Sequence, residues 1–346
     1  MTNGITLTFN SRLAQHRHVL WTSNGEPPLP VADFDPALLR VLPVAIFKQA
    51  LAPLKLGRFY PAQILNTNEV MPAPLFRVVA IAGSDLTADF NHPLAGQAFT
   101  PGNEAGIANP CGTASAAELL RWAGLDTPLH TGEVDYSDAD AFARDDDAED
   151  ATFYTTPRKV MHMDKVCAER LAAFYHAHLP AGGAVLDLMS GWRSHLPAHV
   201  GAVTGLGMNA EELADNPQLQ SVVQHDLNTL PELPFATATF AAVVNTVSIE
   251  YLTQPLKVLQ EVRRVLQPGG SLLLTFSNRF FPPKAIALWK RLHPVERVNW
   301  VVQLLHSAGF TDIHILVERG LKRDPADRYY PQLKEMDPLF AIRARA

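Results

Sequence analysis

Cysteine, long apolar runs and excess basic charge are all scarce in this sequence. It has only two cysteines, Cys111 and Cys167, which excludes a disulfide framework and fits a reducing compartment. No run approaches 18 consecutive apolar residues, the length that spans a bilayer. The segment from Met1 to Asn10 lacks the basic and apolar regions of a signal peptide. We therefore expect a cytoplasmic protein without a membrane partner.

The net charge of −6 argues against nucleic acid as a partner, because nucleic-acid-binding proteins usually carry a basic excess. A metal site is not expected either, although the chain has 13 histidines. The pairs His16/His18 and His176/His178, if helical, would point about 160° apart and could not share an ion. No cysteine or acidic cluster occurs at ligand spacing.

Three common catalytic motifs are also missing. No Gly-x-x-x-x-Gly-Lys-Ser/Thr phosphate loop occurs, and no Gly-x-Gly-x-x-Gly follows an apolar run. A Gly-x-Ser-x-Gly elbow is absent as well. Nucleotide hydrolysis, nicotinamide chemistry and serine-hydrolase chemistry therefore have no support.

A length of 346 residues favours two domains, and the texture of the sequence changes along the chain. Residues 1–137 combine frequent proline with short apolar runs, which predicts a smaller β-rich region of short strands and turns. The acidic stretch 138–150 has the composition of a solvated linker. In residues 151–346, helical patterns alternate regularly with strand-length apolar runs, and this region is the predicted second domain.

This second region alternates helical patterns with short, continuous apolar runs. The runs 184–188, 202–206, 222–226, 240–245 and 271–276 have strand length, and 312–317 and 340–343 follow them. Helical patterns occupy 164–178, 254–266 and 297–308. Continuous rather than alternating apolar strands are typical of a parallel sheet buried on both faces. The sequence therefore predicts an α/β fold with a doubly wound, mostly parallel sheet.

Ligands of such sheets bind outside the carboxyl ends of the strands. Three polar groups follow these ends: Asp187 with Gly191 four residues later, Asp226 after the third run, and Asn245 after the fourth. A glycine in such a turn lets a ligand approach the backbone, and a carboxylate can accept a hydrogen bond from an exocyclic amine. The site is predicted at this edge.

Residues 183–276 resemble the type 11 methyltransferases of class I. The resemblance rests on Val-Leu-Asp-Leu at 185–188, on Asp226 followed by Leu-Pro-Glu-Leu-Pro-Phe at 230–235, and on the segment 258–270 ending in Leu-Gln-Pro-Gly-Gly. It implies a Rossmann-like fold and S-adenosyl-L-methionine as cofactor. It also implies that Asp187 and Gly191 hold the methionine part, that Asp226 with Leu227 holds the adenine, and that the backbone near Asn245 lines the methyl-donor pocket.

Two departures from this family stand out. The family's first loop reads Asp-x-Gly-x-Gly-x-Gly, whereas Met189 and Arg193 replace the outer glycines here. The family's acidic residue for the ribose hydroxyls falls at Gly207, which has no side chain. Asn209, two residues later, is the expected substitute, and Gly207→Asp is expected to strengthen cofactor binding unless the added side chain clashes.

Methyl transfer is an in-line displacement that needs alignment, and a base only when the nucleophile arrives protonated. The candidate catalytic residues are Tyr154, Arg158, His195 and Glu250. A solvated cation for Arg158 and a buried structural histidine for His195 are equally compatible with the sequence. The acceptor is expected to be a small molecule offering a thiol or sulfide, a hydroxyl or a carboxyl, and the sequence does not choose among them.

A second, partial resemblance lies within residues 57–100. Asp-Phe-Asn-His-Pro-Leu-Ala-Gly-Gln at 89–97 is similar to a strand and loop of SlyD/FKBP-type prolyl isomerases. The family's N-terminal strand signature and the strand that closes the barrel are not recognisable, which favours a scaffold over an isomerase. The alternatives to a methyltransferase are therefore a non-catalytic cofactor-binding or interaction protein, and an isomerase or chaperone-like module.

Overall fold

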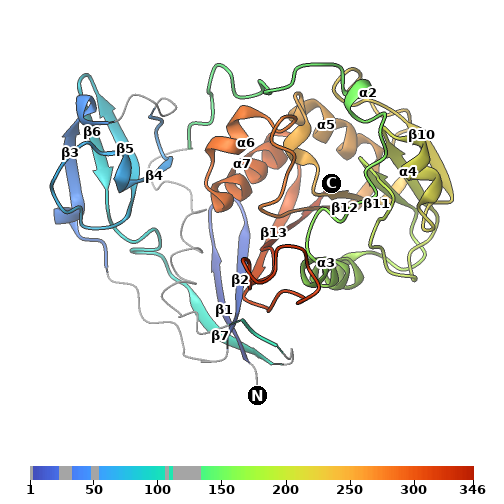
Figure 1. Ribbon diagram of the computed structural model, residues 1–346, viewed down its shortest axis with the longest axis horizontal. Coiled ribbons are helices and arrows are strands. Elements are labelled where there is room, and N and C mark those ends of the chain that lie inside the picture. Colours follow the sequence, from blue (N-terminus) through green and yellow to red (C-terminus); the bar gives the residue numbers. More distant parts are fainter. Residues whose placement is uncertain (1–2, 23–32, 48–53, 106–108, 112–133) are drawn as a thin grey trace.

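The large sheet of this protein has the predicted doubly wound core. The computed structural model describes residues 3–22, 33–47, 54–105, 109–111 and 134–346. Seven strands from the second half are β8 (Val185–Leu188), β9 (Val203–Gly207), β10 (Ser221–Gln224), β11 (Phe240–Thr246), β12 (Leu266–Phe276), β13 (Thr311–Arg319) and β14 (Leu339–Arg345). Their order is β10-β9-β8-β11-β12-β14-β13 (Figure 1). All run parallel except β14, which is antiparallel to both of its neighbours.

Helices cover both faces of this sheet (Figure 1). They are α2 (Asp150–Phe153), α3 (Lys165–His178), α4 (Ala210–Asp215), α5 (Pro255–Val265), α6 (Ala287–Arg291) and α7 (Pro294–Ser307). Helix α3 packs on one face, and α5, α6 and α7 pack on the other. The Asp164 side chain begins α3 by accepting hydrogen bonds from two main-chain N–H groups of its first turn.

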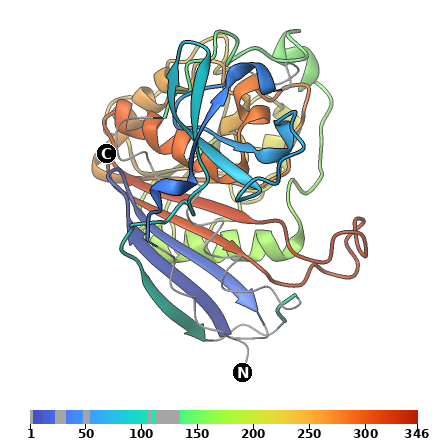
Figure 2. The same ribbon diagram turned by 90° about the vertical axis from the view of Figure 1, so that its left-hand side faces the viewer.

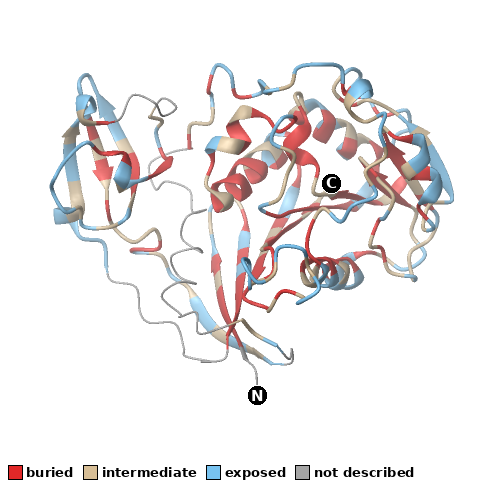
Figure 3. Cartoon of the chain, in the orientation of Figure 1, coloured by how far each residue is buried: buried red, intermediate tan, exposed pale blue. Residues whose placement is uncertain are grey.

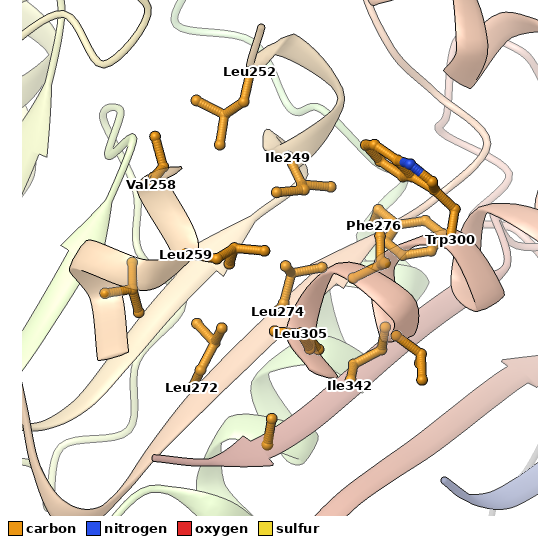
Figure 4. Close-up of a cluster of buried hydrophobic side chains, with 14 of the residues drawn as sticks. Ile249, Leu252, Val258, Leu259, Leu272, Leu274, Phe276, Trp300, Leu305 and Ile342 are labelled. Carbon is orange, nitrogen blue, oxygen red and sulfur yellow. The ribbon is translucent and has the colours of Figure 1, made fainter. Parts of the chain in front are cut away.

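The main core lies between α5, α7 and the central strands (Figure 4). Leu259 and Leu305 belong to it, together with Leu272, Leu274 and Phe276 of β12. Each such side chain contributes about 1.5–3 kcal/mol when fully buried. Figure 3 shows the central strands as almost continuously buried, which explains their unbroken apolar runs.

The N-terminal strands extend the same sheet. Strands β1 (Asn3–Asn10), β2 (Gln15–Thr22) and β7 (Thr100–Ala105) continue it beyond β13 to ten strands. Strand β2 pairs in parallel with β13, and β1 lies antiparallel between β2 and β7. The β-rich N-terminal region is thus divided between two sheets, while the boundaries proposed at 137 and 150 stay predictions.

The histidine pair at the start of the chain lies on a strand, so the helical geometry considered for it does not apply. His16 and His18 are both on β2 and point to the same face. Their rings stack near Phe9, with centroids 4.4 and 5.7 Å from that of Phe9. The described residues contain no group of three or more His, Cys, Asp or Glu side chains placed to hold a metal.

A second, four-stranded antiparallel sheet stands to one side of the large one (Figures 1 and 2). It contains β3 (Leu39–Pro43), β4 (Phe59–Pro61), β5 (Leu75–Ala82) and β6 (Asp85–Asp89) in the order β3-β6-β5-β4. Three single-turn 3-10 helices accompany it: η1 (Pro36–Leu38), η2 (Val44–Ile46) and η3 (Ala62–Ile64). Proline begins or precedes each of these turns, as the composition predicted.

The isomerase-like motif links the two sheets. Asn91 accepts a hydrogen bond from the Asp35 main-chain N–H and donates one to the Asp35 carbonyl, which joins the two connecting segments. Leu94 is fully buried among apolar side chains of β1 and β2. The strand that follows the motif, β7, pairs with β1 of the large sheet and not with the strands of the small sheet. These contacts agree with a scaffold role.

The acidic stretch is anchored to the fold at several points, so its interpretation as a solvated linker was wrong in part. Main-chain hydrogen bonds join Ala141 and Ala143 to the start of α6. Asp138 is buried and pairs with Arg58 of the small sheet region at 3.5 Å and with Arg291 of α6 at 3.3 Å. The acidic side chains find cations on α6 and on the loop before it, which composition alone does not reveal.

No helix in the described ranges combines the length and the apolar character needed to cross a bilayer.

Candidate active site at the carboxyl edge of the sheet

A cavity opens at the carboxyl ends of β8, β9, β10 and β11. It contains about 1210 Å³ of space, including the part open to solvent. The structure brings together eight of the predicted site residues there: Tyr154, Arg158, Asp187, Gly191, His195, Asn209, Asp226 and Leu227. The other two, Asn245 and Glu250, do not line it.

A buried polar network fixes the loop after β8. Asp187 accepts hydrogen bonds from the hydroxyls of Ser190 and Ser194, both at 2.6 Å. Asn216 donates to the Ser194 hydroxyl and to the Gly191 carbonyl. Burial raises the pKa of Asp187 to about 6, although the two hydroxyls act in the opposite direction. The network joins the loop to the end of α4 and holds the loop in one shape.

Three non-glycine residues of the cavity wall adopt left-handed backbone conformations. The φ angles are 57° at Met189, 57° at His195 and 45° at Val247. Met189 occupies a position where the resembling family has glycine. Such conformations cost of order 1–3 kcal/mol each and cluster at functional sites.

Gly207 ends β9, and the structure explains why it is a glycine. A Cβ atom there would lie 2.3 Å from the Ser190 carbonyl oxygen. Because that oxygen belongs to the backbone of the first loop, no side chain fits without moving the loop. The expected gain from Gly207→Asp is therefore wrong, for the steric reason that the sequence analysis set against it.

Asn209 caps helix α4 instead of offering a free amide. Its Oδ1 accepts a hydrogen bond from the Glu212 main-chain N–H at 2.9 Å. Its Nδ2 donates to the carbonyls of Tyr154 at 2.8 Å and Thr155 at 3.1 Å. Both amide hydrogens are thus engaged, which leaves one lone pair on Oδ1 for a ribose hydroxyl.

Glu212 brings a carboxylate to the cavity that the sequence analysis missed. One oxygen accepts a hydrogen bond from the Arg158 main-chain N–H at 2.5 Å, and the other lies 3.1 Å from the position of a Cβ on Gly191. The residue lies on α4, one turn beyond the end of β9. The spacing Asn-x-x-Glu at 209–212 is a helix-capping pattern and would have placed this side chain near the strand end.

Asp226 shapes the turn after β10. Its two carboxylate oxygens accept hydrogen bonds from the Asn228 main-chain N–H and the Thr229 hydroxyl. Asn228, also missed in the sequence, donates to Asp150 at 2.7 Å and to the Tyr251 carbonyl at 2.9 Å. These bonds tie the third loop to the fourth loop and to the segment before α3, residues 150–163, which we call the lead-in segment.

Asn245 and Glu250 lie beneath the cavity wall. Asn245 donates to the Leu188 carbonyl and the Ser248 hydroxyl, so its side chain joins neighbouring strand ends. Glu250 is 1% exposed, and burial raises its pKa to about 7 against the opposing charge of Arg297. Thr246, Val247 and Ser248 line the cavity between them.

The segment before α3 forms the remaining wall. Arg158 packs against aromatic rings, with its guanidinium carbon 3.9 Å from the centroid of Phe153 and 5.8 Å from that of Phe281. Burial, followed by the charges of Arg279, His195 and Arg158, lowers the pKa of His162 to about 4. Burial and Arg193 lower the pKa of His195 as well. Both imidazoles are therefore neutral at pH 7.

Part of this cavity lies in a segment that matches a known protein family. Residues 190–274 match the family described as "Methyltransferase domain". A curated malonyl-[acyl-carrier protein] O-methyltransferase from Erwinia billingiae (strain Eb661) is 28% identical over 140 residues, which cover 40% of this chain and 55% of that protein. The alignment thus spans about half the length of the curated relative.

Solved structures with similar folds include two S-adenosylmethionine-dependent methyltransferases. The protein from Thermotoga maritima is 16% identical, with 51% of this chain and 88% of that chain covered and a TM-score of 0.39. The protein from Aquifex aeolicus is 16% identical, with coverages of 57% and 96% and a TM-score of 0.35. The family match shows a methyltransferase domain in the C-terminal part of this chain, at the sheet edge that carries the cavity described above.

Proposed function

We propose that this chain transfers a methyl group from S-adenosylmethionine to a small nucleophile bound in the cavity. The observation that carries the proposal is the convergence of the Asp187 loop, Glu212 and Asp226 at one sheet edge, within or beside the segment that matches the family. Ligands of doubly wound sheets bind at this edge.

The polar groups that line the cavity fit this cofactor. Gly191 and Gly207 let the first loop pack closely on its neighbours, since a Cβ atom would lie 3.1 Å from a Glu212 carboxylate oxygen at Gly191 and 2.3 Å from the Ser190 carbonyl oxygen at Gly207. The Glu212 carboxylate can accept two hydroxyl hydrogen bonds from a ribose, and Asp226 can accept one from the adenine amine. When bound, S-adenosylmethionine supplies a methyl group activated by a positively charged sulfur.

The protein's own contribution to catalysis is alignment and proton handling. The hydrogen-bonded loops and the ring-packed lead-in segment hold the walls of the cavity in place. Since His162 and His195 are neutral at pH 7, either can accept a proton from a thiol or hydroxyl acceptor. Burial, with Asp150 and Glu250 nearby, raises the pKa of Tyr154, so its hydroxyl stays protonated and does not act as a phenolate base.

The first test is calorimetric titration with S-adenosylmethionine and S-adenosylhomocysteine. Binding of both to the parent protein is expected, and Asp226→Ala is expected to weaken S-adenosylhomocysteine binding by about 1–3 kcal/mol through loss of a desolvated hydrogen bond. Because Asp226 also caps its turn, the unfolding midpoint is measured in parallel. Unchanged affinity in a folded variant would place the adenine elsewhere.

Glu212→Gln tests the carboxylate that we assign to the ribose. An ionised acceptor makes hydrogen bonds about twice as strong as a neutral one, so we expect a loss of about 1–2 kcal/mol in S-adenosylhomocysteine affinity. Glu211→Gln is the matched control, since Glu211 is the preceding helix residue and pairs with Lys159 on the surface. Equal affinities for the two variants would remove Glu212 from the binding site.

The acceptor classes compatible with the site are a thiol or sulfide, a hydroxyl and a carboxyl. The curated relative is named for O-methylation of a malonyl group on a carrier protein, which makes oxygen nucleophiles the first class to test. A metabolite screen with labelled methyl donor measures which class accepts the label. Absence of transfer to any class, with donor binding intact, would favour the non-catalytic alternative.

A further inference from the structure

Arg158 is a half-buried arginine of the cavity wall whose side chain packs against aromatic rings. Its guanidinium lies among the rings of Phe153, Tyr154 and Phe281, at 3.9, 5.9 and 5.8 Å from their centroids. Its only polar partners in the described part of the chain are the carbonyls of Phe153 at 2.7 Å and Thr156 at 3.5 Å. The rings and carbonyls fix the side chain while leaving most of its five N–H donors unused.

No carboxylate lies within ion-pair distance of this guanidinium among the described residues. Arg144, Arg264 and Arg291, which are also largely shielded from solvent, each pair with an aspartate or glutamate. The nearest acidic neighbour along the cavity wall, Glu212, bonds to the main-chain N–H of Arg158 and not to its side chain. A cation that is fixed, part-buried and unpaired is a binding site for an anion, because its desolvation is otherwise uncompensated.

The main chain of Arg158 meets Glu212 beside the donor loop, whereas its guanidinium faces the ring of Phe281. Phe281 follows β12, and its ring stacks on Tyr251, which follows β11, with centroids 6.1 Å apart. The guanidinium therefore lies on the β11–β12 side of the cavity. The loop of Asp187 and Gly191, where the methionine part of the cofactor is expected, follows β8.

We propose that the methyl acceptor carries a carboxylate, and that Arg158 binds this group between Phe281 and the lead-in segment. The proposal rests on the proposed function and names its substrate class. His162 contributes to the same region, since its ring meets Phe281 edge-on at 5.5 Å and stays neutral, so it adds a hydrogen-bond donor without a charge. The aromatic surroundings favour a planar or apolar body next to the carboxylate.

The test uses benzoate as the anionic probe and benzamide as its uncharged isostere, with the full chain and at constant ionic strength. In the presence of saturating S-adenosylhomocysteine, calorimetry is expected to give at least tenfold tighter binding of benzoate than of benzamide. Arg158→Ala is expected to abolish this preference, and Arg158→Lys to restore part of it, since lysine keeps the charge but not the planar fork. Lys159→Ala, which removes a surface cation paired with Glu211, should behave as the parent.

A second arm separates the acceptor from the donor. S-adenosylhomocysteine has a carboxylate and 5′-methylthioadenosine has none, so we expect Arg158→Ala to bind both within twofold of the parent. Loss of S-adenosylhomocysteine affinity alone would assign Arg158 to the donor's carboxylate and overturn the proposal. Equal binding of benzoate and benzamide by the parent would also overturn it. Failure of S-adenosylhomocysteine to bind the parent would instead remove the proposed function, and the benzoate titration without it still tests the anion site.

Discussion

Lys284→Ala is expected to destabilise the protein by about 3–5 kcal/mol, because it removes one of the two cations that pair with the buried Asp150 and leaves two main-chain carbonyls without their donor. The Lys284 side chain is 0% exposed and lies 3.2 Å from Asp150 and 3.3 Å from Asp146. Its ammonium also donates to the carbonyls of Asp146 at 3.2 Å and Ala148 at 2.7 Å. The loss would appear as a lower urea midpoint and as new proteolytic cleavage between Ala139 and Ala151.

Two variants make this expectation specific. Lys290→Ala removes a partly exposed cation that pairs only with Asp145 among the described residues, so a change below about 1 kcal/mol is expected. Lys284→Met fills the buried space with an apolar side chain and leaves Asp150 paired with Arg144, so it should recover part of the stability lost in Lys284→Ala. Equal effects of Lys284→Ala and Lys290→Ala would show that the acidic stretch contributes little to the fold.

Glu250→Gln is expected to change the pH dependence of stability. Burial raises the pKa of Glu250 from 4.5 to about 7. The unfolded chain therefore releases this proton at lower pH than the folded one, and the stability that the neutral carboxyl contributes is lost as pH rises from about 4.5 through 7. The difference in unfolding free energy between variant and parent should shift by about 2–3 kcal/mol between pH 4.5 and 8, in favour of the variant, whose amide does not titrate.

The same variant tests whether Glu250, a candidate catalytic residue from the sequence, takes part in methyl transfer. Since Glu250 lies outside the cavity lining, methyl transfer by Glu250→Gln should stay within a few-fold of the parent at pH 7.5. Asp187, whose pKa is about 6, loses its contribution over an overlapping range and supplies the pH slope that remains in the variant. If the difference in unfolding free energy between variant and parent does not change with pH, Glu250 is ionised throughout this range. A large loss of methyl transfer in the variant would restore Glu250 as a catalytic residue.

Strand and helix positions in the second half were predictable because burial on both faces leaves a plain apolar pattern. The run 240–245 became β11 and the helix 297–308 became α7, each with shifts of a few residues. The N-terminal pairing was not predictable, since the alternation in β1 and β2 shows that strands form but not which edge they join. Only the structure shows that β2 meets β13.

The placement of a candidate residue at the cavity followed from the sequence where a strand end fixes it, and did not follow where a helix brings the residue back to the cavity. Asp187 and Asp226 line the cavity because they stand at strand ends. Asn209 was assigned a ligand role from its place in the sequence, but the cap it provides for α4 engages its amide. Glu212 was not predicted as a site residue because one helical turn separates it from the strand end.

The pairing of β2 with β13 sets an order of events during synthesis. Gln15 and His314 are register partners, so about 300 residues must be added before the contact can form. At 5–20 residues per second the first hairpin waits roughly 15–60 s for its parallel neighbour. Throughout that time one edge of β2 has unpaired N–H and C=O groups, and such an edge can pair with another nascent chain. Aggregation during expression is therefore expected to begin at the N-terminal hairpin, and a lower growth temperature or a chaperone that covers this edge should raise the yield of folded protein.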